Sequence, residues 1–156
     1  MTDKYNHYTE KKDLLENQVV LVTGASKGIG RAVAIAASSC GAKVILHGRD
    51  IKALEGVHDE IVALGGSNPS IVPLDLTALT WEDSIAFANA IAEEIGQLDG
   101  MVHNAGVLGP RTPIEQYPLE AWQEVIQVNL TAPFLLTRAC LPLIKHSHNA
   151  SIIFTL

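Results

Sequence analysis

Short apolar runs alternate with helical segments along nearly the whole chain, and this alternation is the strongest constraint on its fold. The apolar, β-branched runs lie at residues 19–22, 43–47, 70–74, 98–103 and 151–155. Segments with helical periodicity separate them, at about 28–40, 50–64, 80–95 and 119–145. Strands that are apolar at every position are buried on both faces, so the pattern predicts a parallel sheet joined by right-handed crossovers, with helices on both faces. We expect one α/β domain with about five strands.

Capping signals at the helix starts support this assignment. Asp50 is well placed to cap the second helical segment, and Thr80 with Asp83 has the spacing of a capping box. Residues 1–17 are polar and lack apolar periodicity, so we expect a polar arm ahead of a single domain at residues 18–156.

The composition argues against several classes of protein. The chain has 156 residues, of which 47% are hydrophobic, and a net charge of −6. The apolar fraction argues against disorder, and the acidic balance argues against nucleic acid or an anionic membrane surface as the main partner. The polar first 20 residues hold no signal-peptide core, and Cys40 and Cys140 lie in apolar segments that favour reduced thiols. We therefore expect a cytoplasmic protein.

A glycine-rich segment, Thr-Gly-Ala-Ser-Lys-Gly-Ile-Gly at residues 23–30, connects the first strand to the first helix. Gly24 can adopt a turn conformation closed to other residues, Gly28 removes a Cβ where a pyrophosphate would approach, and Gly30 permits tight helix packing. The helix amino terminus then offers free N–H groups and a partial positive charge to that anion. A simple turn is the alternative, but the position inside a βαβ unit favours nucleotide binding.

The Gly-x-x-x-Gly-x-Gly spacing resembles the TGxxxGxG hallmark of the short-chain dehydrogenase/reductase family. Further motifs match in register: Asp75 after the third strand, Asn-Ala-Gly at 104–106 after the fourth, and Asn129 on the long helix. The segments HGRD, HNAG and WQEVIQVN look especially like those of the YciK-type oxidoreductases of bacteria. The resemblance covers about residues 15–156. It implies a Rossmann-like doubly wound sheet of strand order 3-2-1-4-5, lacking the family's last strands and helices.

By the same resemblance, the cofactor-binding residues are spread over four loops. They are Gly24, Ser26, Lys27, Gly28, Ile29, Gly30, Arg49, Asp75, Leu76, Asn104, Ala105 and Gly106. Asp75 would accept a hydrogen bond from the adenine amino group, with the backbone of Leu76 beside it, and Asn104 would tie its loop to the sheet. A turn or helix-capping role is the alternative for Asp75.

The end of the second strand bears on the choice of cofactor. A carboxylate there would bind the adenosine ribose of NAD and repel the extra phosphate of NADP, but Gly48 stands where NAD-type family members carry an acid. The Arg49 guanidinium can make a bidentate contact with a phosphate, and Lys27 could approach the same phosphate from the other side. We expect NADP rather than NAD. Solvated surface charges are the alternative for both cations, and Asp50 could still serve NAD.

Asn129 is the candidate catalytic residue. It lies four residues before Pro133, which has no N–H to donate to the Asn129 carbonyl, so we expect the helix to kink there. The freed carbonyl must find water or another donor. In the family that the motifs resemble, this carbonyl holds a water in a proton relay to the active-site lysine. A purely structural kink is the alternative.

The other catalytic groups of that family are a Ser after the fifth strand and a Tyr-x-x-x-Lys on the next helix. This chain stops at Leu156, before both places, and the chance match Tyr8-x-x-x-Lys12 lies in the polar arm. The leading hypothesis is the dinucleotide-binding half of an NADP-dependent oxidoreductase acting on a small-molecule carbonyl or alcohol. The alternatives are a nucleotide-binding module without chemistry and a nonfunctional truncated product.

The remaining expectations concern partners and packing. The family is usually homo-oligomeric, and an exposed fifth strand predicts aggregation or a partner for this chain. We expect His146 and His148 to be surface residues rather than metal ligands, because no acidic or cysteine ligand stands beside them. Trp81, Trp122 and His103 are expected to be packing residues.

Overall fold

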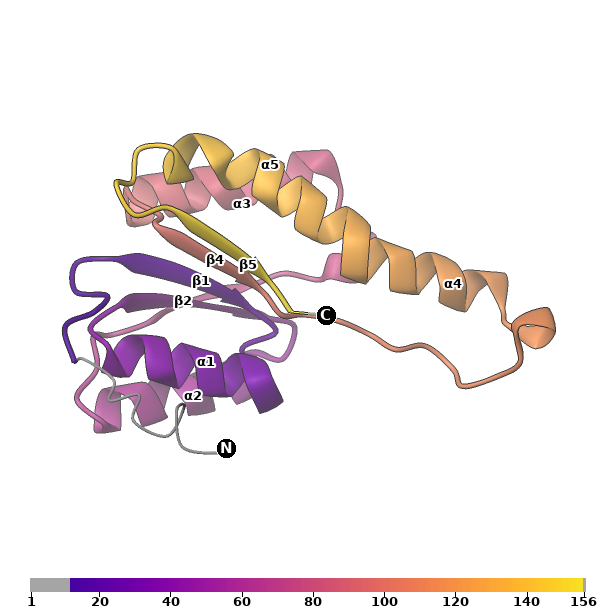
Figure 1. Ribbon diagram of the computed structural model, residues 1–156, viewed down its shortest axis with the longest axis horizontal. Helices are drawn as coiled ribbons and strands as arrows, with labels where there is room; N and C mark the ends of the chain where they lie inside the picture. The colour runs from indigo at the N-terminus through magenta and orange to yellow at the C-terminus, as the bar shows by residue number, and fades with distance from the viewer. Residues whose placement is uncertain (1–11, 156) are drawn as a thin grey trace, which may run out of the picture.

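The computed structural model describes residues 12–155, and a five-stranded parallel sheet forms its centre (Figure 1). The strands are β1 (Val19–Thr23), β2 (Lys43–Gly48), β3 (Ser70–Pro73), β4 (Gly100–His103) and β5 (Ser151–Phe154). Their order is β3-β2-β1-β4-β5, and every pairing is parallel. The predicted fold class, strand number and strand order are confirmed.

Helices cover both faces of the sheet (Figure 1). They are α1 (Gly28–Ser39), α2 (Ile51–Ala63), α3 (Trp81–Glu94), α4 (Leu119–Ile126) and α5 (Ala132–Ile144). Helices α1 and α2 lie on one face and α3 and α5 on the other, while α4 extends beyond the sheet. Right-handed crossovers between parallel strands produce this doubly wound arrangement.

Each face of the sheet carries its own hydrophobic core. Because side chains alternate along a strand, Leu21 and Ile45 pack in the core under α3 and α5, whereas Val22 and Leu46 pack under α1 and α2. Strands β1 and β4 are buried at every residue, as their uninterrupted apolar character requires.

The predicted capping signals are formed. The Asp50 carboxylate accepts the Ala53 N–H at 3.0 Å, and Thr80 and Asp83 make a reciprocal capping box. The sequence pattern did not predict the short helical turns, which are η1 (Leu76–Ala78), η2 (Ile114–Gln116) and η3 (Gln127–Thr131).

The break in the long helix is η3, a π-helical turn between α4 and α5. It contains Asn129, and Pro133 follows in the first turn of α5. The α-helix is interrupted at this point, while the predicted kink stays a prediction. The form of the interruption is a widened turn, one of the known consequences of interrupting the backbone ladder of a helix.

The two tryptophans differ in their surroundings. Trp81 lies beneath Arg138, whose guanidinium carbon is 4.4 Å from the ring centroid. Trp122 is 53% exposed, so the expectation that it packs is wrong. The reason is that α4 projects beyond the sheet (Figure 1), and none of its residues is buried.

Both ends of the described chain meet the sheet. Leu15 packs against the core under α1 and α2, and its N–H donates to the Cys40 carbonyl at 2.8 Å. The domain boundary at residue 18 stays a prediction, and Tyr8 lies outside the described residues. At the other end β5 is an edge of the sheet, where Ile153 and Phe154 are 52% and 53% exposed.

Candidate functional site

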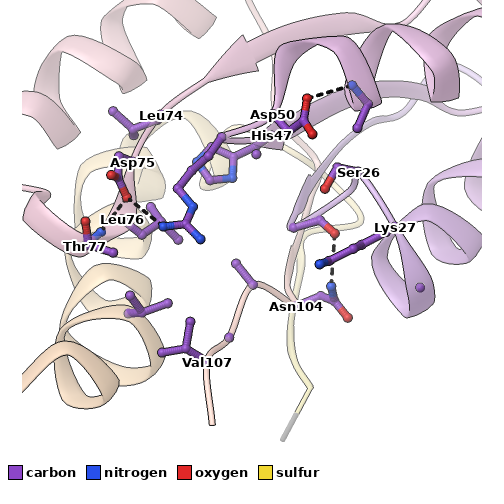
Figure 2. Close-up of a pocket in the computed structure, with 18 of the residues that line it drawn as sticks. Ser26, Lys27, His47, Asp50, Leu74, Asp75, Leu76, Thr77, Asn104 and Val107 are labelled. Atoms are coloured by element: carbon purple, nitrogen blue, oxygen red, sulfur yellow. Dashed lines mark hydrogen bonds and ion pairs between the residues drawn. The ribbon is translucent and has the colours of Figure 1, made fainter. Parts of the chain in front are cut away.

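A cleft of about 470 Å³ opens at the carboxyl ends of β1 to β4 (Figure 2). All the residues predicted to bind a cofactor, except Gly30, line it: Gly24, Ser26, Lys27, Gly28, Ile29, Arg49, Asp75, Leu76, Asn104, Ala105 and Gly106. The cleft also includes residues outside that prediction, among them His47, Gly48, Asp50, Thr77 and Val107. Ligands bind at this edge in doubly wound folds.

The turn between β1 and α1 depends on close approaches that a Cβ would prevent. Gly24 has φ +66°, and a Cβ there would lie 2.9 Å from Ala105 Cα. A Cβ on Gly30 would collide with the Gly24 carbonyl and with the Asn104 side chain. The predicted tight packing at Gly30 is confirmed. Gly30 does not line the cleft, but it packs against Gly24 and Asn104, which do.

The amino end of α1 borders the cleft, and no side chain among residues 12–155 caps it. Its N-cap residue, Lys27, makes no side-chain capping bond, and the first turn holds no acidic residue. Helices α2 and α3, in contrast, both carry side-chain caps. A Cβ on Gly28, whose φ is +57°, would meet no atom within 4 Å. The N–H groups of this turn therefore border open space, an arrangement that can hold an anion.

Thr23 joins the loop after β4 to the end of β1. Its hydroxyl oxygen accepts the Asn104 N–H at 2.9 Å and the Ala105 N–H at 3.0 Å. The Asn104 side chain in turn donates to the Thr23 carbonyl at 3.2 Å. The predicted tie between this loop and the sheet is present, and the Thr23 hydroxyl is a part of it that sequence reasoning missed.

Arg49 and Asp75 form an ion pair at the cleft (Figure 2). Arg49 Nη1 lies 3.8 Å from Asp75 Oδ1, and the two side chains are 60% and 54% exposed. The same oxygen accepts the Thr77 N–H at 3.0 Å, and this bond, more than Arg49, holds the pKa of Asp75 below its usual value. The capping role is therefore present, while a role toward a ligand stays a prediction. An exposed pair of this kind is weak, so Arg49 can turn to another anion.

Asn129 lies outside the cleft and holds one of its walls. Its side chain accepts the Val107 N–H and donates to the Val107 carbonyl, both at 2.9 Å, and Val107 lines the cleft. Gln127, in the same π-turn, donates to the carbonyls of Leu76 and Leu79. The turn η3 thus holds two of the cleft's loops in place. A catalytic role for the Asn129 carbonyl stays a prediction.

Two buried histidines lie near the strand ends, one toward α3 and one toward α5. His103 is 4% exposed, and its Nε2 lies 2.9 Å from Thr137 Oγ1, so it is packed as expected. His47 is 1% exposed and meets the edge of Phe87. Burial lowers the pKa of each ring to about 4, and for His47 the nearby His103 adds to this effect. Sequence reasoning gave His47 no role of its own, although it begins the HGRD segment, because the pattern does not show that its ring is buried without a hydrogen-bond partner.

Metal ligation and membrane insertion find no support in the part of the chain that the structure describes. Within residues 12–155, no group of three or more His, Cys, Asp or Glu side chains is arranged to hold a metal ion. His146 and His148 are exposed, as expected. None of the described helices is long and apolar enough to cross a membrane.

The fold and the cleft define the class of protein as a Rossmann-like domain, in which a glycine-rich turn leads from the first strand to the first helix. The sequence model of the family described as short chain dehydrogenase matches residues 18–156. The chain belongs to the short chain dehydrogenase family.

Three relatives illustrate this membership. The oxidoreductase YciK of Escherichia coli K12 is 44% identical over 149 residues, which are 96% of this chain and 59% of YciK. A short chain dehydrogenase from Shigella flexneri 2a, complexed with NADP, is 42% identical with a TM-score of 0.89, and the match covers 92% of this chain and 60% of that one. A short chain dehydrogenase from Escherichia coli CFT073, complexed with NADPH, is 44% identical with the same TM-score and the same coverage.

The predicted resemblance to YciK-type oxidoreductases is confirmed. The chain spans about three-fifths of the length of these relatives.

Proposed function

We propose that the cleft binds NADP(H) and that the chain is the cofactor-binding half of an oxidoreductase, one that transfers hydride between the nicotinamide and a small-molecule carbonyl or alcohol. The observation that carries the proposal is the combination of an uncapped helix amino end with two cations at the same cleft, Lys27 and Arg49. Gly48, between the strand end and Arg49, contributes no negative charge.

The β1–α1 turn fits the pyrophosphate of a dinucleotide. The open space at Gly28 admits an anion close to the backbone, and the first N–H groups of α1 can donate to it. Gly24 and Gly30 bring the turn against the loop at Asn104, so the N–H groups are held in place before a ligand arrives. Such preorganisation reduces the entropy lost on binding.

The end of β2 favours NADP over NAD. Arg49 is more than half exposed, and its guanidinium can pair with the additional phosphate on the adenosine ribose. Asp50, the acid that could serve NAD, is engaged in capping α2 through Ala53. The relatives complexed with NADP and NADPH support this choice.

Bound NADP(H) would supply the hydride donor or acceptor, and the residues described here would bind and orient it. Asn129 and Gln127 would keep the cleft loops in position through their bonds to Val107, Leu76 and Leu79. In the whole protein, proton transfer falls to the Ser and Tyr-x-x-x-Lys that the family places after β5.

Cys40 and Cys140 are free buried thiols, which is in keeping with a proposed cytoplasmic location.

A nucleotide-binding module without chemistry is the second candidate, because the described residues can bind a dinucleotide without any of those catalytic groups. The two candidates share the cleft and differ in turnover. Both require NADPH binding, so binding is the property to test first.

The experiment is a titration of NADPH and NADH, followed by nicotinamide fluorescence, on the unaltered chain, Arg49→Ala and Arg138→Ala. Loss of a charged phosphate contact predicts that Arg49→Ala binds NADPH about 10- to 100-fold more weakly, with NADH affinity unchanged. Arg138 lies over Trp81, away from the cleft, so Arg138→Ala should bind both cofactors like the unaltered chain. Equal weakening of both cofactors by Arg49→Ala, or no effect on either, would contradict the proposal.

A further inference from the structure

His47 is a buried side chain whose ring nitrogens have no hydrogen-bond partner among the described residues. It is 1% exposed, and neither Nδ1 nor Nε2 has a hydrogen-bond partner among residues 12–155. A neutral imidazole has one N–H donor and one bare nitrogen acceptor, so both capacities are unused. Buried polar groups without partners are rare and destabilise a fold, and a native example calls for an explanation.

The neighbouring His103 shows that a buried histidine in this sheet can still have a hydrogen-bond partner for its ring. Its Nε2 is 2.9 Å from Thr137 Oγ1 and its ring stacks on Phe154 at a centroid distance of 4.8 Å, so it has a structural role. The nearest ring to His47 is Phe87, 5.9 Å away and edge-on, which offers no conventional hydrogen-bond acceptor or donor. A leucine would fill an apolar site of this kind without leaving polar atoms unpaired.

The position of His47 points to a ligand. It pairs with Thr23 of β1 on one side and Val72 of β3 on the other, at the carboxyl end of the sheet. His47 is among the residues that line the cleft, together with Arg49 and Leu76, where the adenosine end of the cofactor would lie (Figure 2). The purine edge carries both hydrogen-bond donors and acceptors, which match the two unused capacities of a neutral imidazole.

We propose that His47 is a further binding residue for the cofactor, and that one of its ring nitrogens hydrogen-bonds the purine, directly or through one water molecule. This inference rests on the proposed function. The ring stays neutral at physiological pH, since burial lowers its pKa to about 4. The unpaired nitrogens are then a property of the free protein that ligand binding relieves.

The test measures stability and binding on the same variants, His47→Leu and His47→Gln, with NADPH and 2′,5′-ADP as the probes. His47→Leu should raise the Tm of the free protein by about 2–4 °C. It should also weaken both probes about fivefold, the effect of one neutral hydrogen bond. His47→Gln, which keeps a donor and an acceptor, should bind within about twofold of the unaltered chain. The control is His58→Leu on α2, which removes a histidine bonded to Asn68, outside the cleft, and should leave both affinities unchanged.

A His47→Leu variant that binds both probes as tightly as the unaltered chain would overturn the inference, whatever its stability. If the unaltered chain itself fails to bind either probe, the proposed function fails and this inference falls with it. The two failures are therefore distinguishable within one experiment.

Discussion

The substitution Gly30→Ala tests the closest packing in the β1–α1 turn. Gly30 lies in the first turn of α1, where alanine is otherwise a better helix former than glycine by about 0.5–1 kcal/mol. An added Cβ would, however, collide with the Gly24 carbonyl and the Asn104 side chain. Helix propensity and packing therefore predict opposite signs, and the structure decides between them.

The packing effect should be larger. Overpacking costs about 1–3 kcal/mol, and the obstacle here includes a backbone carbonyl that cannot rotate away as a side chain can. After the gain in helix propensity, we expect a net loss of about 1–2 kcal/mol in the free energy of unfolding. For a chain of this length, that lowers the Tm by about 2–8 °C.

Urea unfolding followed by circular dichroism measures the change directly, and the slope of the transition shows whether the unfolding remains two-state. Gly56→Ala is the matched control, because Gly56 lies within α2 and an added Cβ there meets no atom within 4 Å. This control should gain about 0.5–1 kcal/mol from helix propensity alone. If Gly30→Ala were as stable as the unaltered chain, the close approach of α1 to the turn would be refuted.

Two further predictions concern the same end of the sheet. Thr23→Val should lower the free energy of unfolding by about 2–4 kcal/mol, because the Asn104 and Ala105 N–H groups lose their acceptor; a change below about 0.5 kcal/mol in urea unfolding would contradict this. Stability should also fall as pH drops from 6.5 to about 4, since the unfolded chain binds protons that His47 and His103 resist when folded. Urea midpoints across this range check it, and a flat profile would contradict it.

The strands and most helix limits were predictable because they depend on local patterns, whereas the strand order was implied by the resemblance to a known family. Uninterrupted apolar runs identify buried strands, and Asp50 and Thr80 mark helix starts through bonds to residues three positions away. Pro133 likewise predicted an irregular helix, because proline has no backbone N–H to donate to the Asn129 carbonyl. The sequence could not specify that the irregularity is a π-turn. Trp122 shows the opposite case, because its exposure depends on how far α4 extends beyond the sheet.

The parts of the site that sequence reasoning missed depend on contacts between distant segments. Asn129 holds Val107 across 22 positions of sequence, and Thr23 holds Asn104 across 81. No local pattern encodes either separation. His47 is a third case, because its lack of hydrogen-bond partners among the described residues depends on the elements that pack against it and not on its own strand.

The most direct test of the central claim is the ratio of the dissociation constants for NADH and NADPH on the unaltered chain, measured by fluorescence at one fixed ionic strength. The cations at the cleft and the absence of an acid at Gly48 predict that NADPH binds about 10- to 100-fold more tightly. Equal affinities, a preference for NADH, or binding of neither cofactor would contradict the account.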